Sequence, residues 1–225
     1  MPKIEEPFQA IINGDKPRLI DMLRRDPGIV HARSEEGDTP LLVAAYRGEL
    51  DLVELLIEHG AEVSIHEAAT LGRADRIEAI LNVDPKAVDT ISSDGWTPLH
   101  LAAHFDRREA AELLIEQGAH VNATSSTSSL APRNTPLHAA VASDHYEMAV
   151  LLLEYGADVN AHQANGMTPL HVAAASPNTG LVRLLLDHKA DPDSADNAGM
   201  RPVDVALKHE RYESADMLRA AMSHT

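Results

Sequence analysis

The residues best suited to chemistry in this chain are its 13 histidines. Three of them, His100, His138 and His171, each follow the same tripeptide, Thr-Pro-Leu. His100 and His104 are four residues apart, a spacing that puts two imidazoles on one face of a helix, where zinc could bind them. No Asp or Glu at helical spacing supplies a third ligand. We therefore expect no metal and no cofactor.

Motifs for covalent or phosphate chemistry are missing from the sequence. The stretch 124–134 is rich in serine, but it reads as a polar loop and lacks the Gly-x-Ser-x-Gly pattern of a nucleophile turn. Neither a glycine-rich phosphate loop nor a dinucleotide-binding fingerprint occurs. We therefore expect the chain not to be an enzyme.

Composition narrows the possible partners. The 225 residues include 19 basic and 35 acidic side chains, a formal net charge of −16, which disfavours nucleic acid because phosphates need neutralising Lys and Arg. Cysteine is absent, which excludes disulfides and thiolate metal sites, and no apolar run approaches the ~20 residues of a membrane span. These features predict a soluble, cytoplasmic monomer that binds neither nucleic acid nor membrane.

Five nearly identical openings recur along the chain. Four begin with Thr-Pro, at Thr39, Thr97, Thr135 and Thr168, and the fifth is Arg201-Pro202. The last three openings are 33 residues apart. Within each, Thr suits the N-cap of a helix and Pro its first position, and a second, leucine-rich helical stretch follows. A repeat of this length and wording resembles the ankyrin repeat.

The resemblance implies an all-α solenoid of stacked antiparallel helix pairs joined by short hairpin loops. A small residue marks the middle of each opening helix, at Ala10, Ala44, Ala68, Ala102, Ala140, Ala173 and Ala206. We therefore expect one domain, 1–225, with units at about 4–36, 37–65, 66–94, 95–132, 133–165, 166–198 and 199–225. Since a single unit cannot bury its own apolar stripe, the first and last should act as caps.

The resemblance also implies roles for individual residues. The histidine of each Thr-Pro-Leu-His opening should be structural, bonding the backbone of a neighbouring unit. The chain should be a non-enzymatic interaction module that docks a protein on its concave face. The positions that face partners in this family correspond here to Tyr46, Arg47, Leu71, Trp96, His104, Phe105, Met167 and Met200.

Two further considerations bear on function. Acidic residues such as Asp38 and Asp94 fall at hairpin tips, which suits a partner with a basic surface. The alternative is a ligand- or metal-binding protein, or an enzyme, that uses the histidine-rich concave surface. Trp96 has two readings as well, because a tryptophan in this slot can anchor a partner or pack on the adjacent hairpin.

Two irregularities interrupt the repeat. The step from Ala44 to Ala68 is only 24 residues, too short for a hairpin loop. It predicts a gap in the row of hairpins that exposes Thr70 and Leu71 more than their counterparts in other units. The loop 124–134 is five residues longer than its counterpart in the next unit, so it is either a tolerated insertion or a flap over the concave face.

Overall fold

A computed structural model describes residues 5–126 and 133–223 of the chain. Within these ranges fourteen α-helices form seven antiparallel pairs, and no strand occurs. The pairs are α1 (Glu5–Ile12) with α2 (Lys16–Arg25), α3 (Pro40–Tyr46) with α4 (Leu50–Glu58), α5 (Ile65–Leu71) with α6 (Ala74–Val83), α7 (Pro98–His104) with α8 (Arg108–Glu116), α9 (Pro136–Ala142) with α10 (Tyr146–Glu154), α11 (Pro169–Ala175) with α12 (Thr179–Asp187), and α13 (Pro202–Lys208) with α14 (Tyr212–Met222). Short 3-10 helices at Pro27–His31 and Pro85–Asp89 follow α2 and α6. The predicted all-α solenoid is confirmed.

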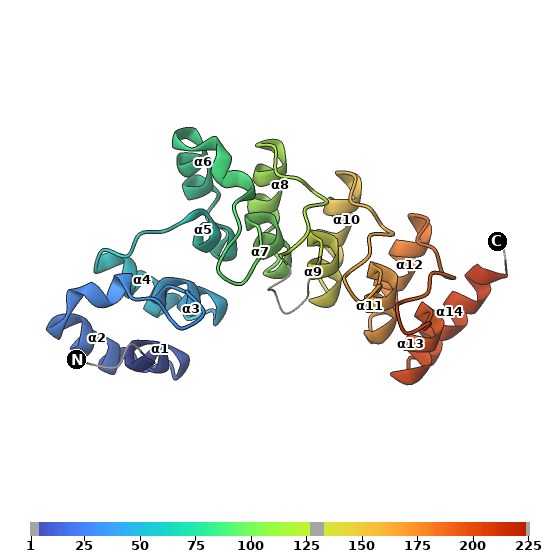
Figure 1. Ribbon diagram of the computed structural model, residues 1–225, viewed down its shortest axis with the longest axis horizontal. Helices are drawn as coiled ribbons and strands as arrows, with labels where there is room; N and C mark the ends of the chain where they lie inside the picture. Colours follow the sequence, from blue (N-terminus) through green and yellow to red (C-terminus); the bar gives the residue numbers. More distant parts are fainter. Residues whose placement is uncertain (1–4, 127–132, 224–225) are drawn as a thin grey trace.

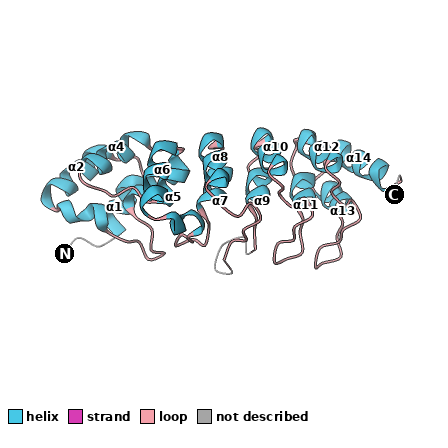
Figure 2. Ribbon diagram, turned by 90° about the horizontal axis from the view of Figure 1, so that it is seen from above, coloured by secondary structure: helices cyan, strands magenta, loops and turns pink. Residues whose placement is uncertain are grey.

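The array is bent. The first helix of each pair lies toward the hollow side of the bend and the second toward the outer side (Figure 1). The connecting loops between successive pairs project from one edge of the array (Figure 2). Every helix in the described ranges is too short or too polar to cross a lipid bilayer.

Each Thr-Pro-Leu-His opening builds its own helix start, as α9 illustrates. The Thr135 hydroxyl accepts the N–H of His138 at 3.4 Å and lies 2.8 Å from the Nδ1 atom of the same imidazole. Pro136 occupies the first position of the helix, where no N–H is needed. The four residues of the motif therefore satisfy groups that a helix start otherwise leaves unpaired.

Hairpin loops, termed fingers and numbered by the unit that each one opens, connect the pairs. In each, the first residue donates its backbone N–H to the carbonyl of the last, at 2.8–3.0 Å. They are finger two (34–38), finger four (92–96), finger five (125–134), finger six (163–167) and finger seven (196–200). Finger five is longer by five residues. Because 127–132 lie outside the described ranges, the role of loop 124–134 remains a prediction.

Neighbouring fingers can approach very closely. Gly166 has φ = 83°, and a Cβ placed on it would lie 2.7 Å from the backbone nitrogen of Asn197 in finger seven. Only glycine fits this position, because both the backbone conformation and the space exclude a side chain. The contact is completed by the Asn197 amide, which donates to the carbonyl of Ala164 at 2.9 Å.

The histidines at the fourth position of the opening motif link each unit to the next finger. The Nε2 atoms of His100, His138 and His171 donate to carbonyls of the following unit at 2.8, 3.3 and 2.9 Å. Their acceptors are Asn134, Met167 and Met200, each the last residue of its finger. The predicted structural role of these histidines is confirmed.

A second ladder runs through the loops that follow the outer helices. The Asn122 amide donates to the carbonyl of Gly156, and its oxygen accepts the N–H of Asp158 at 2.7 Å. Asn160 repeats the arrangement one unit later with Lys189 and Asp191. Asp89 holds the equivalent position one unit earlier, where it accepts the His120 N–H at 3.1 Å and forms an ion pair with the His120 ring.

A third ladder caps the carboxyl ends of the inner helices. Arg107 donates from Nε to the carbonyl of Thr70 at 2.9 Å, and Arg211 donates to that of Ala175 at 3.2 Å. His145 does the same for the His104 carbonyl, at 2.9 Å. A cation or N–H donor is favourable there, because the last carbonyls of a helix are unpaired and carry partial negative charge.

The third unit departs from this pattern. It has no finger, and Ser64 caps α5 directly, with the Glu67 side chain completing the capping box. Buried Glu67 occupies the slot that histidine fills in later units, and it accepts the Thr39 hydroxyl of the preceding unit at 2.6 Å. Buried apolar residues fall into two clusters on either side of this junction, one spanning 10–61 and the other 65–218.

The predicted gap in the row of fingers is wrong. Finger four reaches past the third unit and contacts finger two, where the Ser93 hydroxyl donates to the Asp38 carboxylate. Thr70 is fully buried, whereas its counterparts Tyr46 and His104 are half-buried, and Leu71 is half-buried like its counterpart Phe105. The missing finger shortens the separation of its neighbours, so they close over the space that its absence would leave.

Candidate functional site

Four of the predicted partner-facing residues form one aromatic cluster on the inner side of the array. Tyr46 at the end of α3 stacks on Phe105 just after α7, with ring centroids 5.5 Å apart and planes at 19°. His104 makes edge-to-face contacts with Phe105 and with Trp96, at ring-centroid distances of 4.7 and 5.2 Å. All four residues are half-buried, so the set is partly packed and partly accessible to solvent. This set is termed the aromatic cluster.

The two sides of the aromatic cluster come from units that are not neighbours. Tyr46 belongs to the second unit, whereas Trp96, His104 and Phe105 belong to the fourth. Trp96 sits at the end of finger four and also approaches His100, at 5.9 Å between centroids. Both readings of Trp96 therefore remain compatible with its position, because its ring packs within its own unit and is still partly accessible.

Asp94 of finger four ties the two sides together. Its carboxylate accepts the Tyr46 hydroxyl at 2.8 Å. Burial, followed by the negative charge of Asp94, raises the pKa of Tyr46 well above its usual value, so the phenol stays protonated and donates. The sequence placed Asp94 at a hairpin tip but carried no signal for this bond, because the partners are 48 residues apart.

His104 is fixed by the next unit. Its Nδ1 atom lies 2.9 Å from the Ser143 hydroxyl, and its carbonyl accepts His145 Nε2 at 2.9 Å. Burial, and then the neighbouring His145, lower the pKa of His104. The imidazole is therefore neutral at physiological pH and behaves as an aromatic surface with one committed nitrogen.

The remaining predicted residues are not part of the ring contacts of the aromatic cluster. Arg47 is exposed, and Leu71 packs on the amino-terminal apolar cluster beside the groove that Asp106 and Arg107 also line. Met167 and Met200 are half-buried at the ends of fingers six and seven. Four of the eight predicted residues thus form the aromatic cluster, and the other four lie outside its ring contacts.

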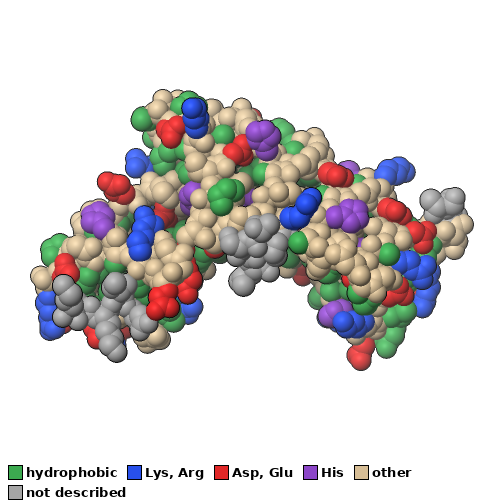
Figure 3. Space-filling view, viewed as in Figure 1, with side chains coloured by type: hydrophobic (Ala, Val, Ile, Leu, Met, Phe, Trp, Pro, Cys, Tyr) green, Lys and Arg blue, Asp and Glu red, His purple; other side chains and the backbone are tan. Residues whose placement is uncertain are grey.

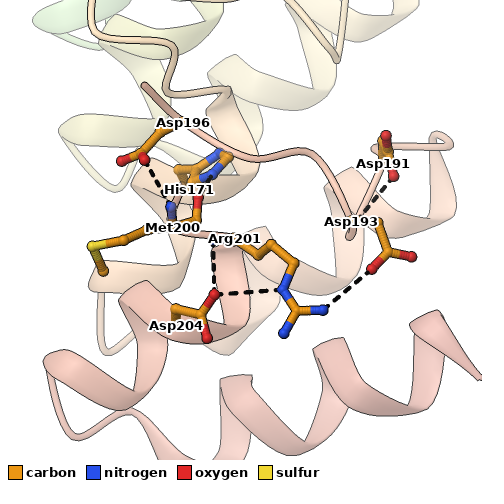
Figure 4. Close-up of polar contacts among 7 residues, drawn as sticks. All are labelled: His171, Asp191, Asp193, Asp196, Met200, Arg201 and Asp204. Carbon is orange, nitrogen blue, oxygen red and sulfur yellow. Dashed lines mark hydrogen bonds and ion pairs between the residues drawn. The ribbon is translucent and has the colours of Figure 1, made fainter. Parts of the chain in front are cut away.

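Figure 4 shows how Met200 is held. Its carbonyl accepts the His171 imidazole, and its N–H donates to Asp196 at 2.9 Å. Arg201 turns the other way, toward Asp204 at 3.4 Å and Asp193 at 3.7 Å, while the Met200 side chain points away from it. The thioether is the adaptable part of an otherwise fixed finger.

The histidines do not assemble into a metal centre in the described part of the chain. Both ring nitrogens of His100 are engaged, by Thr97 and by the carbonyl of Asn134. Across residues 5–126 and 133–223, no three His, Asp or Glu side chains converge in a way that could hold a metal ion. His100 and His104 both lie against the ring of Trp96, with planes tilted by 46° and 85°.

Charged side chains of both signs are spread over the face of the molecule that Figure 3 shows. Figure 3 shows carboxylates and basic groups on both arms of the bend, with the hollow between them. Asp38, Asp94 and Glu67 all lie close enough to raise the pKa of Tyr46, so the aromatic cluster has a negative surround.

Comparisons with known proteins agree with this geometry. A model of ankyrin repeats in three copies matches residues 8–125 and 65–163, and a model of ankyrin repeats in many copies matches residues 170–219. Human Ankyrin repeat and SOCS box protein 16 is 34% identical over 101 residues, which cover 41% of this chain and 22% of that protein.

Other relatives are also longer proteins. Alpha-latrocrustotoxin-Lt1a of Latrodectus tredecimguttatus is 30% identical over 121 residues, covering 48% of this chain and 9% of the toxin. Protein phosphatase 1 regulatory subunit 12A of Mus musculus is 34% identical over 86 residues, covering 38% of this chain and 6% of that subunit. The match spans less than a quarter of each relative's length. Repeat models, helix pairs and histidine ladder agree, and the chain belongs to the ankyrin repeat family, whose arrays act as protein-interaction modules.

Proposed function

We propose that the chain is a non-enzymatic adaptor that binds a protein on its hollow side, with the aromatic cluster at the centre of the interface. The half-buried aromatic cluster of Tyr46, Trp96, His104 and Phe105 carries this proposal. Aromatic residues make up only 3% of the chain, so their concentration at one accessible place calls for an explanation beyond core packing. Interface hot spots favour such clusters of partly packed aromatic side chains.

The outlying residues extend this surface. Arg47 follows the inner helix of the second unit, and Leu71 ends the inner helix of the third. Met167 and Met200, in units six and seven, offer flexible apolar contacts beyond the fourth unit. A partner that reached from Trp96 to Met200 would lie along the fingers. One relative's name describes a regulatory subunit of a phosphatase, a protein that acts through another protein, and we infer the same mode of action here.

Charge suggests the chemistry of the partner. The chain carries a net charge of −16, and Asp38 and Asp94 border the aromatic cluster. A basic surface with one or two apolar side chains is therefore the complement that we propose. Association with such a partner should slow as salt shortens the Debye length below ~10 Å, whereas dissociation should change less.

Affinity capture from lysate of the native host tests the proposal. Wild type is compared with Trp96→Ala and Phe105→Ala, and the control variant is Val83→Ala, since Val83 is 87% exposed on the outer helix α6. Proteins that bind wild type and Val83→Ala but are lost with both cluster variants, all folded by circular dichroism, would support the interface. Equal capture by all four chains would move the interface elsewhere.

A further inference from the structure

We propose that residues 62–64 form a hinge between two rigid blocks, and that contacts between fingers two and four act as a latch that holds the blocks together across the aromatic cluster. The amino-terminal block comprises units one and two, up to Ala61, and the carboxyl-terminal block begins at Ile65. The latch consists of two contacts of finger four, Ser93 with Asp38 and Asp94 with Tyr46, together with the stack of Tyr46 on Phe105.

The division of the core defines the blocks. Each block has its own cluster of buried apolar residues. Tyr46, Val63 and Leu71 are the half-buried apolar side chains that pack across the junction, and Val63 contacts both clusters. Because packed cores resist deformation, motion concentrates where two cores meet through few side chains.

The ladders that join later units do not bridge this junction. In later units the histidine of this slot donates to the finger of the next unit. Glu67 occupies the slot in the third unit and instead accepts the Thr39 hydroxyl of the preceding unit. Arg73, in the position of Arg107, does not cap α3 but pairs with Glu54 on the exposed surface of α4. Exposed ion pairs contribute little to rigidity, because solvent screens them.

Space for movement exists on the outer side. A groove of about 390 Å³ separates the end of α4 from the start of α6, lined by Ile57, Ala61 and Val63 on one side and by Arg73 and Arg76 on the other. The inner helices α3 and α5 remain packed together, as the Thr39–Glu67 bond shows. The blocks can therefore turn about residues 62–64 while α3 and α5 stay in contact, with the groove closing or widening on one side and the latch parting on the other.

The consequence rests on the proposed function. Tyr46 is supplied by one block and Trp96, His104 and Phe105 by the other, so the aromatic cluster is complete only while the latch is closed. A partner that contacts both sides binds the closed form and shifts the population toward it. Conversely, anything that opens the latch divides the docking surface.

Distance measurements between spin labels test the hinge without any partner. The chain has no cysteine, so labels go only where they are introduced. The first pair, Glu58→Cys on α4 with Glu78→Cys on α6, spans the junction, and the second, Glu78→Cys with Glu147→Cys on α10, lies within one block. All three positions are exposed. Tyr46→Ala should make the distance distribution of the first pair at least about twofold broader and leave the second unchanged.

Matched variants separate the latch from general loosening. Tyr155→Ala removes a tyrosine remote from the junction and should leave the first pair as in wild type. Tyr46→Phe keeps the ring and removes only the bond to Asp94, so it should broaden the first pair less than Tyr46→Ala does, which also covers the case in which the alanine variant does not fold. If neither Tyr46 variant changes the first pair, the latch is excluded, whereas the docking surface could still bind its partner.

Discussion

The rings of Tyr46 and Phe105 stack at 5.5 Å although a whole repeat lies between the units that carry them. In the intervening unit the equivalent position of Tyr46 is Thr70, a smaller side chain that is fully buried. The contact is possible because that unit has no finger to hold its neighbours apart. A local shortening of the sequence thus creates a long-range contact, and it places the accessible aromatic residues where two blocks meet.

Tyr46 should stabilise the fold by amounts that two substitutions separate. Tyr46→Phe loses the 2.8 Å bond to Asp94 and should cost about 1 kcal/mol of unfolding free energy. Tyr46→Ala also loses the stack and should cost about 2–3 kcal/mol. Urea denaturation followed by circular dichroism measures both. Tyr212→Phe, at a position 65% exposed, serves as control and should be neutral.

Stability should fall as the solution becomes acidic. Burial lowers the pKa of His100 and of His138 to about 4, whereas an imidazole in the unfolded chain titrates near ~6.5. The unfolded chain therefore binds more protons between these values. The contribution of each neutral, buried histidine to the free energy of unfolding is fully present above pH ~6.5 and is lost as the pH falls toward ~4. At pH ~5 the loss should be about 2 kcal/mol per histidine.

The variant His138→Leu checks the assignment, because Leu42 fills the same slot in the second unit. It should be less stable than wild type at neutral pH, since it loses bonds to Thr135 and Met167. Its urea midpoint should then fall less steeply between pH ~7.5 and ~5. An unchanged slope would show that other groups cause the acid sensitivity.

The effect of Asp89→Asn on the stability of the fold should change sign with pH. The hydrogen bond to Asp89, and then its charge, raise the pKa of exposed His120, so this pair stabilises the fold below the unfolded pKa of ~6.5 and the effect is lost as pH rises through the folded value. An asparagine removes that contribution but can donate to the carbonyl of Gly118, as Asn122 does to Gly156. The variant should be less stable than wild type in acid and at least as stable in mild alkali. Thermal melts at one acidic and one mildly alkaline pH test this prediction. An equal loss of stability at both pH values would contradict it.

Ser214→Ala should stabilise the last unit. The Ser214 hydroxyl lies in α14 and, within residues 5–126 and 133–223, is the buried side-chain polar group that lacks a hydrogen-bond partner. Ala110 occupies the equivalent position in α8. Removing an unsatisfied buried hydroxyl should raise the unfolding free energy by about 1 kcal/mol. A lower melting temperature for the alanine variant would mean that the hydroxyl is bonded in solution.

Local features of the fold could be predicted from the sequence because they repeat. The Thr-Pro-Leu-His motif predicted helix starts at Thr97, Thr135 and Thr168. The alanine positions located the helix pairs even in units that lack the motif. The roles of Glu67 and Asp89 could have been inferred in the same way, since each occupies a slot that histidine or asparagine fills elsewhere.

The candidate site was less predictable, because it depends on contacts between units. Alignment of equivalent slots indicated Tyr46 and Phe105 separately, but spacing alone could not show that a missing finger brings them together. The same limit explains why Thr70 and Leu71 were expected to be exposed. The position of a residue within its repeat determines the direction of its side chain. Which residues that side chain contacts depends on how the next unit stacks.

Finger five has a base that is complete in itself. Ser125 donates its N–H to the Asn134 carbonyl, and Asn134 donates its N–H to the Ser125 hydroxyl at 2.9 Å. Asn134 also accepts hydrogen bonds from the His100 ring and from Gln163, and Ser126 donates its N–H to the carbonyl of Gly95 in finger four at 2.8 Å. The base of finger five is therefore bonded to the units on both of its sides. We expect a foreign peptide grafted between Ser126 and Arg133 to leave these bonds in place, so that a recognition element can be exchanged there without rebuilding the helix pairs.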